Sequence, residues 1–371
     1  GAVQLAQQVL AGAPYELVYG TRRWSITRDQ VREWLTFKVL DGSVTVGLRE
    51  SDVNPFLEGI AKEVDVPVQE PKFSMKDGKV LEFQPARTGL AVDVAASVSQ
   101  IDEKVRQVGI RDVDLVVAEQ KPAAAGTSGN DLGIVELIGE GHSNFKGSPK
   151  NRRHNIATGA DKLNGILIEP DEEFSLVKTL GAIDASTGYL TELVIKGNKT
   201  VPEYGGGLCQ IGTTTFRAAL DAGLPILERK NHSYRVSYYE PAGTDATIYD
   251  PKPDFRFKND TGSHILFTTE INGDNLYFRF YGTRDGRTVV QTKPKITNQV
   301  RPGPTKLIES TDLAPGTRKC IEKAHTGADA EFSRTVTYPG GEVKSDVFKS
   351  HYKPWQEVCL VGVAKPAPAA Q

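Results

Sequence analysis

The chain has 371 residues, of which 39% are hydrophobic and 25% are charged, and its formal net charge at pH 7 is −2. This length predicts two or three globular domains, and the near-neutral charge excludes the strongly basic character of nucleic-acid-binding proteins. No stretch is long and apolar enough to span a bilayer. The sequence begins at Gly1-Ala2 without a signal peptide, so we expect that an export signal or a membrane anchor has been removed from its N-terminus.

Residues 1–120 predict a small α/β domain. Apolar residues at positions 3–10 recur at helical spacing, and Thr27 opens a capping box for a second helix. Asp77-Gly78 is typical of a hairpin turn between two short strands. This layout, together with residues 87–93, resembles a family of peptidoglycan-binding domains, and the resemblance implies that the domain binds glycan or stem peptide.

Residues 121–132 are rich in small residues and predict a linker. Further along, the glycines at 205–207 precede Cys209, and apolar spacing predicts a helix from there to Gly223. Cys209 therefore falls in the first turn of a helix, where unpaired N–H groups and the helix dipole favour a thiolate. The alternative is a buried structural cysteine.

A histidine and two aspartates follow the cysteine. Residues 231–239, which include His232, predict a strand, and residues 244–250 predict a returning strand. Cysteine, histidine and aspartate can supply a nucleophile, a base and a group that orients the base, although a lone histidine in a strand is usually structural. Two orienting carboxylates remain open: the motif favours Asp245, whereas simple hairpin counting places Asp250 beside His232.

This order of residues resembles the transglutaminase-like and papain-like cysteine enzymes. The resemblance implies that the central domain packs a cysteine-bearing helix on an antiparallel sheet. For the whole chain we expect a multidomain α+β protein. A small α/β domain precedes the central domain, and a small all-β module follows it.

Five more polar or glycine positions are candidates for oxyanion or substrate binding. Gly206 and Gly207 let a substrate approach the backbone, and Gln210 is placed to support an oxyanion or a substrate amide. Arg153 and Asn155 are candidates to grip substrate carboxylates. The alternatives are helix capping for Gln210 and a solvated helix face for the other two.

The sequence predicts neither a metal nor a cofactor. His142 and His154 lack metal-ligand spacing, and the cysteines form no Cys-x-x-Cys pair. A disulfide between Cys320 and Cys359 would suit an oxidising compartment and leave Cys209 as the free thiol, the alternative being two buried thiols.

The C-terminal part of the chain is predicted to be all-β. Residues 289–363 contain alternating strand patterns and resemble the G5-type β modules, which implies a spacer or a wall-adhesion element. Residues 364–371 predict a disordered tail.

Residues 133–285 resemble the VanW domain family. The matching segments are His142-Ser143-Asn144-Phe145, Arg153-His154-Asn155-Ile156, Leu163-Asn164-Gly165, residues 170–175, Val201-Pro202, residues 205–214, Glu228-Arg229, His232-Ser233, Asp245-Ala246-Thr247, residues 254–257 and Asn259-Asp260-Thr261. The resemblance implies an extracytoplasmic, cell-envelope L,D-transpeptidase that acts on peptidoglycan stem peptides. Cys209 would form a thioester with a donor stem, and an acceptor amine deprotonated by His232 would complete a 3–3 cross-link.

Two other functions remain open at this stage. A cysteine peptidase or amidase would use the same residues but trim stem peptides with water, and a scaffold without catalysis would bind the cell wall and keep Cys209 buried. We expect the protein to be a monomer.

Overall fold

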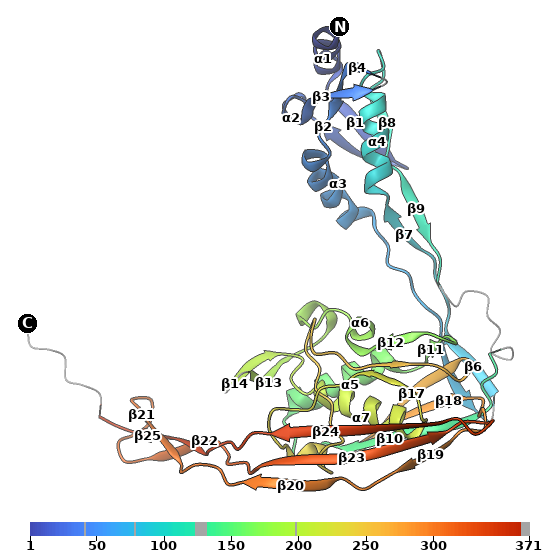
Figure 1. Cartoon of the computed structure of the whole chain (residues 1–371). Coiled ribbons are helices and arrows are strands. Elements are labelled where there is room, and N and C mark those ends of the chain that lie inside the picture. Colours follow the sequence, from blue (N-terminus) through green and yellow to red (C-terminus); the bar gives the residue numbers. More distant parts are fainter. Residues whose placement is uncertain (41, 78, 123–131, 197–198, 365–371) are drawn as a thin grey trace, which may run out of the picture. The chain divides into compact units, whose positions relative to one another are not determined.

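The computed structural model describes residues 1–40, 42–77, 79–122, 132–196 and 199–364 (Figure 1). Two units emerge, one made of residues 1–71 and 84–126 and the other of residues 72–83 and 127–371. Most of the predicted linker 121–132 and of the predicted tail 364–371 lies outside the described residues. Within the described ranges, no helix combines the length and apolarity needed to cross a bilayer.

The first unit packs helices against short strands. Its elements are α1 (Ala2–Gly12), β1 (Tyr15–Tyr19), β2 (Arg22–Ile26), α2 (Arg28–Trp34), β3 (Leu35–Leu40), β4 (Ser43–Leu48), α3 (Glu50–Val64), β7 (Gly89–Val92), α4 (Val94–Lys104), β8 (Asp112–Asp114) and β9 (Val117–Gln120). Strand β1 pairs antiparallel with β2 and parallel with β8, and Leu17 of β1 is fully buried in the core. The predicted capping box at the start of α2 is present, since Thr27 and Gln30 hydrogen-bond each other's backbone N–H.

The hairpin of β5 (Lys72–Lys76) and β6 (Lys79–Gln84) departs from the predicted boundary of the first domain. The sequence predicts this hairpin within a domain of residues 1–120, but the structure places residues 72–83 in the second unit. Phe73 shares an apolar cluster with Ile134 and Leu266, and its N–H donates to the carbonyl of Gly165. Alternating apolar residues predict a hairpin, but they do not say which core the hairpin covers.

The central part of the second unit is built on a four-stranded antiparallel sheet with the order β10-β18-β17-β11. Its elements are β10 (Glu136–Asn144), α5 (Lys150–Leu163), β11 (Ile166–Ile168), β12 (Glu173–Ser175), α6 (Leu176–Leu180), η1 (Ala185–Thr187), β13 (Thr191–Lys196), β14 (Lys199–Tyr204), α7 (Cys209–Asp221), β15 (Ile226–Glu228), η2 (Ser237–Tyr239), β16 (Arg256–Lys258), β17 (Ile265–Asn272) and β18 (Asn275–Gly282).

Helix α7 lies very close to β10 because two positions on that strand are glycines. A Cβ atom at Gly141 would lie 2.1 Å from the carbonyl oxygen of Thr214, and one at Gly139 would lie 2.6 Å from Cβ of Ala222. Beneath this contact, Phe216 and Phe280 are buried in one continuous core. The predicted packing of the cysteine-bearing helix on an antiparallel sheet is therefore present.

The strands predicted at 231–239 and 244–250 are absent, so the expected hairpin around His232 is wrong. The segment contains only the short 3-10 turn η2 and otherwise runs as loop. Arg217 of α7 donates hydrogen bonds to the carbonyls of Tyr239, Glu240 and Thr244. These carbonyls bind a side chain from another element and are not engaged in a ladder, which is why the alternating sequence does not form a strand pair.

The C-terminal strands are β19 (Thr288–Gln291), β20 (Lys295–Val300), β21 (Lys306–Ser310), β22 (Arg318–Glu322), β23 (Gly327–Thr337), β24 (Val343–Tyr352) and β25 (Val358–Gly362). The long strand β23 pairs with β19, β20 and β24 (Figure 1). Phe332 of β23 belongs to the central core, and buried Arg334 donates to the carbonyl of Leu224, just beyond α7. The predicted segments 133–285 and 289–363 therefore share one core.

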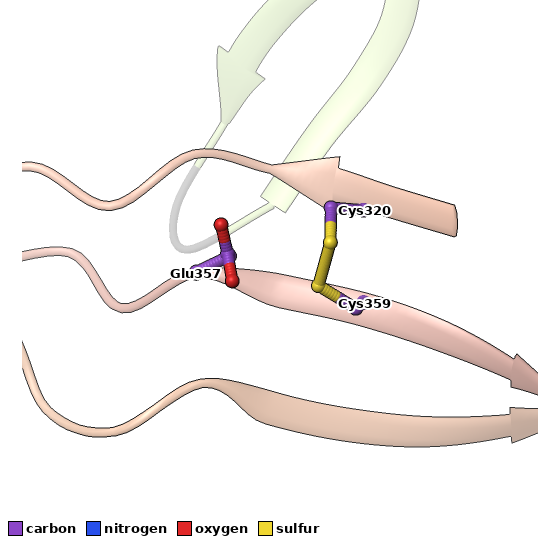
Figure 2. Close-up of side chains that lie close together, drawn as sticks. All are labelled: Cys320, Glu357 and Cys359. Carbon is purple, nitrogen blue, oxygen red and sulfur yellow. A yellow bond between two sulfur atoms is a disulfide. The ribbon is translucent and has the colours of Figure 1, made fainter. Parts of the chain in front are cut away.

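The C-terminal sheet with the strand order β21-β25-β22 carries a disulfide. Cys320 of β22 lies opposite Cys359 of β25, and their sulfur atoms are bonded (Figure 2). Glu357 lies beside them, but sulfur atoms held in a disulfide offer no thiolate to a metal. Cys209 is left as the free cysteine.

Candidate active site

The glycine loop before α7 sets the position of Cys209, the first residue of that helix. Gly205 and Gly207 have φ values of +76° and +114°, which residues with a side chain rarely adopt. A Cβ atom at Gly207 would also lie 2.8 Å from Cγ of Arg152. The loop therefore needs glycine both for its backbone angles and for its close packing.

Cys209 is half-buried as a residue, and its sulfur has polar neighbours. It lies 3.3 Å from Oγ1 of Thr247 and 3.7 Å from the carbonyl oxygen of Ile248. A buried structural cysteine would have apolar neighbours and no opening to solvent. The polar surroundings of the Cys209 sulfur therefore differ from those of a cysteine sealed in apolar packing.

His232 and Cys209 favour each other's charged forms. Burial opposes ionisation of the thiol, but the charge and the hydrogen bond of His232 lower the pKa of Cys209 to about 7. Burial likewise opposes the imidazolium, but the thiolate charge and the hydrogen bond with Asp245 raise the pKa of His232 to about 9. Near neutral pH the two residues therefore favour a thiolate–imidazolium pair, the reactive state of cysteine nucleophiles.

Asp245 is the carboxylate that contacts His232. Its Oδ2 atom lies 2.6 Å from Nδ1 of His232 and also accepts the backbone N–H of His232 at 2.7 Å. This contact at Nδ1 leaves the other ring nitrogen for Cys209. Burial opposes the Asp245 charge, but the hydrogen bond and charge of His232, together with the charge of Arg229, lower the pKa of Asp245 to about 2.

Asp250 has a different environment. Its side chain is exposed, and among the described residues it makes no hydrogen bond or ion pair with His232. Hairpin counting predicts Asp250 beside His232, and that prediction is wrong because the hairpin itself does not form.

Sequence reasoning missed three residues that surround this pair. Arg229 lies 3.2 Å from Oδ1 of Asp245 and is almost fully buried. Tyr352 donates its phenol O–H to the same oxygen at 2.5 Å. Tyr239 stacks on the ring of His232, with the ring centroids 4.4 Å apart. Arg229 lies in one of the VanW-like segments, and its place there is a signal that could have identified it as a site residue. Nothing in the sequence links Tyr352 to an aspartate 107 positions earlier.

Gly206 and Gly207 lie in the loop that leads into Cys209. Among the described residues, their backbone N–H groups have no hydrogen-bond acceptor. The amide of Asn155 holds this loop from beneath, because it donates to the carbonyls of Leu190 and Gly206 and accepts the N–H of Leu190. Asn155 therefore supports the loop from within the protein and does not face a substrate.

The other polar candidates also have partners inside the protein. Gln210 is fully buried, and its oxygen accepts from Arg152 at 2.9 Å. Arg153 forms an ion pair with Asp274 at 2.6 Å, so its guanidinium already has a carboxylate partner. His142 and His154 make ordinary hydrogen bonds, to Asn275 and to the carbonyl of Gly188 respectively.

A polar hollow of about 260 Å³ lies near the site but does not include it. Its lining residues are His142, Ser143, Asn144, Lys146, Arg217, Ser237, Tyr238 and Glu240. Tyr238 lines this hollow, and the guanidinium of Arg152 lies 4.2 Å from the centre of its ring. The same guanidinium donates to Gln210, the residue that follows Cys209. The geometry of the thiol, the imidazole and the carboxylate, and not this hollow, defines the candidate active site.

Two protein families match the chain. Residues 151–281 match the family described as "VanW like protein", and residues 23–114 match "Putative peptidoglycan binding domain". Both resemblances expected from the sequence are thereby confirmed.

Individual relatives cover only part of the chain. "Uncharacterized protein YoaR" of Bacillus subtilis (strain 168) is 31% identical over 166 residues, which cover 45% of this chain and 54% of that protein. "Vancomycin B-type resistance protein VanW" of Enterococcus faecalis (strain ATCC 700802 / V583) is 33% identical over 117 residues, covering 30% and 42% respectively. The chain thus spans about half the length of these relatives.

A solved structure titled "IgA1 Protease G5 domain structure" is similar to part of the chain. It covers 23% of this chain and 100% of its own, with 19% identity and a TM-score of 0.15.

Proposed function

We propose that the protein is a peptidoglycan L,D-transpeptidase with Cys209 as its nucleophile. In the sequence, a VanW-like domain follows a segment that matches a peptidoglycan-binding family. The observation that carries the proposal is the hydrogen bond between His232 and Asp245, together with the pKa shifts that couple His232 to Cys209. These residues supply a nucleophile, a base and an orienting carboxylate. The substrate class is taken from the two family resemblances.

The first half-reaction is acylation of the enzyme. The Cys209 thiolate attacks the carbonyl carbon of the third residue of a donor stem tetrapeptide, and a C–S bond forms. The peptide bond to the terminal D-alanine breaks, and the His232 imidazolium gives its proton to the leaving amine. The donor stem remains on Cys209 as a thioester, and D-alanine departs.

The second half-reaction transfers the acyl group. An amine of a neighbouring stem attacks the thioester carbonyl and loses a proton to the neutral His232 imidazole. A new amide bond forms, the C–S bond breaks, and the thiolate–imidazolium pair is restored. The product is a 3–3 cross-link between two stems.

Both steps pass through a tetrahedral intermediate with a negatively charged oxygen. The backbone N–H groups of Gly206 and Gly207 are candidates to stabilise that charge, since their hydrogen atoms have no acceptor among the described residues. Asn155 fixes the loop through the Gly206 carbonyl, so that these donors are held in place before the substrate arrives.

This chemistry belongs to the cell envelope, and we propose that the protein works outside the cytoplasm as a monomer on the stem peptides and glycan of peptidoglycan. It needs neither a metal nor a cofactor. The disulfide between Cys320 and Cys359 suits an oxidising compartment.

Intact-mass spectrometry of the full chain with a purified tetrapeptide muropeptide tests the proposal. We expect an acyl adduct on the Cys209 peptide that lacks the mass of the terminal D-alanine, followed by cross-linked dimers. In Cys209→Ala both products should disappear while the fold is retained. Trimmed stems without dimers would show that water is the acceptor and would replace transpeptidation with hydrolysis. The absence of both adduct and product would leave a wall-binding scaffold.

A further inference from the structure

The C-terminal strand β24 and the residues after it run alongside the loop that carries His232. Asn231 donates to the carbonyl of His351 at 3.0 Å, and the N–H of Lys353 donates to the carbonyl of Ser233 at 2.8 Å. Both chain neighbours of His232 are thus bound to one C-terminal segment.

Two further contacts extend the same interface. The rings of Tyr234 and Trp355 lie edge to face with centroids 3.9 Å apart, and Arg229 donates to the hydroxyl of Ser350 at 2.9 Å. The loop from residue 229 to residue 234 therefore contacts the segment from residue 350 to residue 355 along its length. Part of the C-terminal β module, which resembles a spacer, therefore packs against the loop that carries the proposed base His232.

Tyr352 adds a contact to the proposed catalytic carboxylate itself. Its side chain is buried, its O–H donates to Oδ1 of Asp245 at 2.5 Å, and its oxygen accepts the N–H of Gly243 at 2.7 Å. Because the Tyr352 phenol both donates and accepts a hydrogen bond, its O–H group is held in one orientation. Hydrogen bonds to an ionised carboxylate are stronger than those between neutral groups.

Each oxygen of Asp245 has its own set of partners. Oδ2 accepts from His232, and Oδ1 accepts from Arg229 and Tyr352. The carboxylate cannot rotate without losing contacts on both sides. Loss of the phenol O–H would keep Arg229 and the negative charge, but it would remove one of the two groups that fix Oδ1. The effect would then fall on the alignment of His232 more than on its charge.

We propose that Tyr352 is a positioning residue for the cysteine site: it holds Asp245 so that His232 stays aligned with Cys209. The C-terminal β module is then a working part of the active centre and not a spacer. This inference rests on the proposed role of Cys209 as the nucleophile.

The test is the pH dependence of Cys209 alkylation by iodoacetamide in the full chain, where the other two cysteines are disulfide-bonded. In Tyr352→Phe we expect the acid limb of the alkylation profile to move up by about one pH unit, because a less aligned imidazolium stabilises the thiolate less. The rate at pH 7 should then fall about 5-fold. A purely structural role would lower thermal stability without moving this limb.

Tyr338→Phe is the matched control. Tyr338 also donates its phenol O–H to a carboxylate of the central domain, to Oδ2 of Asp260 at 3.0 Å, but it does not touch the cysteine site. We expect its alkylation profile to match that of the wild type. An unchanged profile in Tyr352→Phe, or an equal shift in both variants, would overturn the proposal.

A second variant covers the case in which Tyr352→Phe does not fold. Ser350→Ala removes the hydroxyl that accepts from Arg229, and we expect a shift of about half a pH unit and a fall of about 2-fold at pH 7. A wild-type profile in that variant would overturn the inference that the C-terminal β module helps to position Asp245. A wild-type protein whose thiol titrates near the ordinary value of about 8.5 and forms no acyl adduct would instead overturn the proposed function.

Discussion

Nδ1 of His232 and Oδ2 of Asp245 lie 2.6 Å apart, and the same carboxylate oxygen also accepts the backbone N–H of His232. The aspartate therefore fixes both the ring and the backbone of the proposed base. Because the contact is made at Nδ1, the ring presents its other nitrogen to Cys209. This relationship leads directly to the first prediction.

Asp245→Asn should lower the rate of thioester formation by about 100-fold or more, because an amide can donate to Nδ1 and favour the wrong tautomer. The rate is measured by quenched mass spectrometry of the Cys209 adduct. Asp250→Asn is the matched control, since Asp250 is exposed, and it should react like the wild type. Equal rates in the two variants would contradict the assignment of Asp245.

The rate of acylation should depend on pH through a bell-shaped profile. The thiolate forms as the pH rises through about 7, and the imidazolium that protonates the leaving amine is lost as the pH rises through about 9. The acylation rate should therefore be highest between about pH 7 and pH 9. Both apparent pKa values belong to the coupled pair of Cys209 and His232 and not to either residue alone. Adduct formation measured from pH 5 to pH 10 checks this, and a rate that still rises beyond pH 9 would argue against a role for the imidazolium.

Gly207→Ala should reduce both stability and reactivity. The position has a φ of +114°, and the added Cβ atom would lie 2.8 Å from Cγ of Arg152. We expect a loss of about 2 kcal/mol in the free energy of unfolding, measured by urea titration, and slower adduct formation because the proposed oxyanion donors move.

Gly273→Ala is the comparison for this loop. Gly273 also has a positive φ, of +60°, but a Cβ atom there would meet nothing within 4 Å. It should cost about 1 kcal/mol of stability and leave adduct formation unchanged. A similar loss of reactivity in both variants would mean that general destabilisation, and not the shape of the glycine loop, sets the rate.

Removal of the disulfide should destabilise the C-terminal sheet. The bond closes a loop with a sequence separation of 39 residues, for which the loss of chain entropy in the unfolded state predicts about 4 kcal/mol. The double variant Cys320→Ser, Cys359→Ser tests this in a urea titration followed by fluorescence. Unchanged unfolding would mean that the pair contributes no stability.

Local signals in the sequence determined several features of this protein. The three glycines and the apolar spacing behind them place Cys209 at the start of α7, because a helix end and its breaker residues are written within one short segment. The capping box of Thr27 and Gln30 is equally local. The count of three cysteines, with one of them in the glycine motif, favoured the pairing of Cys320 with Cys359 that the structure contains.

Tertiary structure alone decided the surroundings of His232. Its loop forms no hairpin, because Arg217 and the C-terminal segment take up the backbone groups that a strand ladder would need. For this reason strand counting chose Asp250, while the structure brings Asp245 to the ring. Tyr352 reaches the same carboxylate from 107 residues away, and the hairpin of β5 and β6 covers a core beyond its predicted domain. Sequence patterns record which side chains are buried, but the partner that buries each one is set only when distant segments pack together.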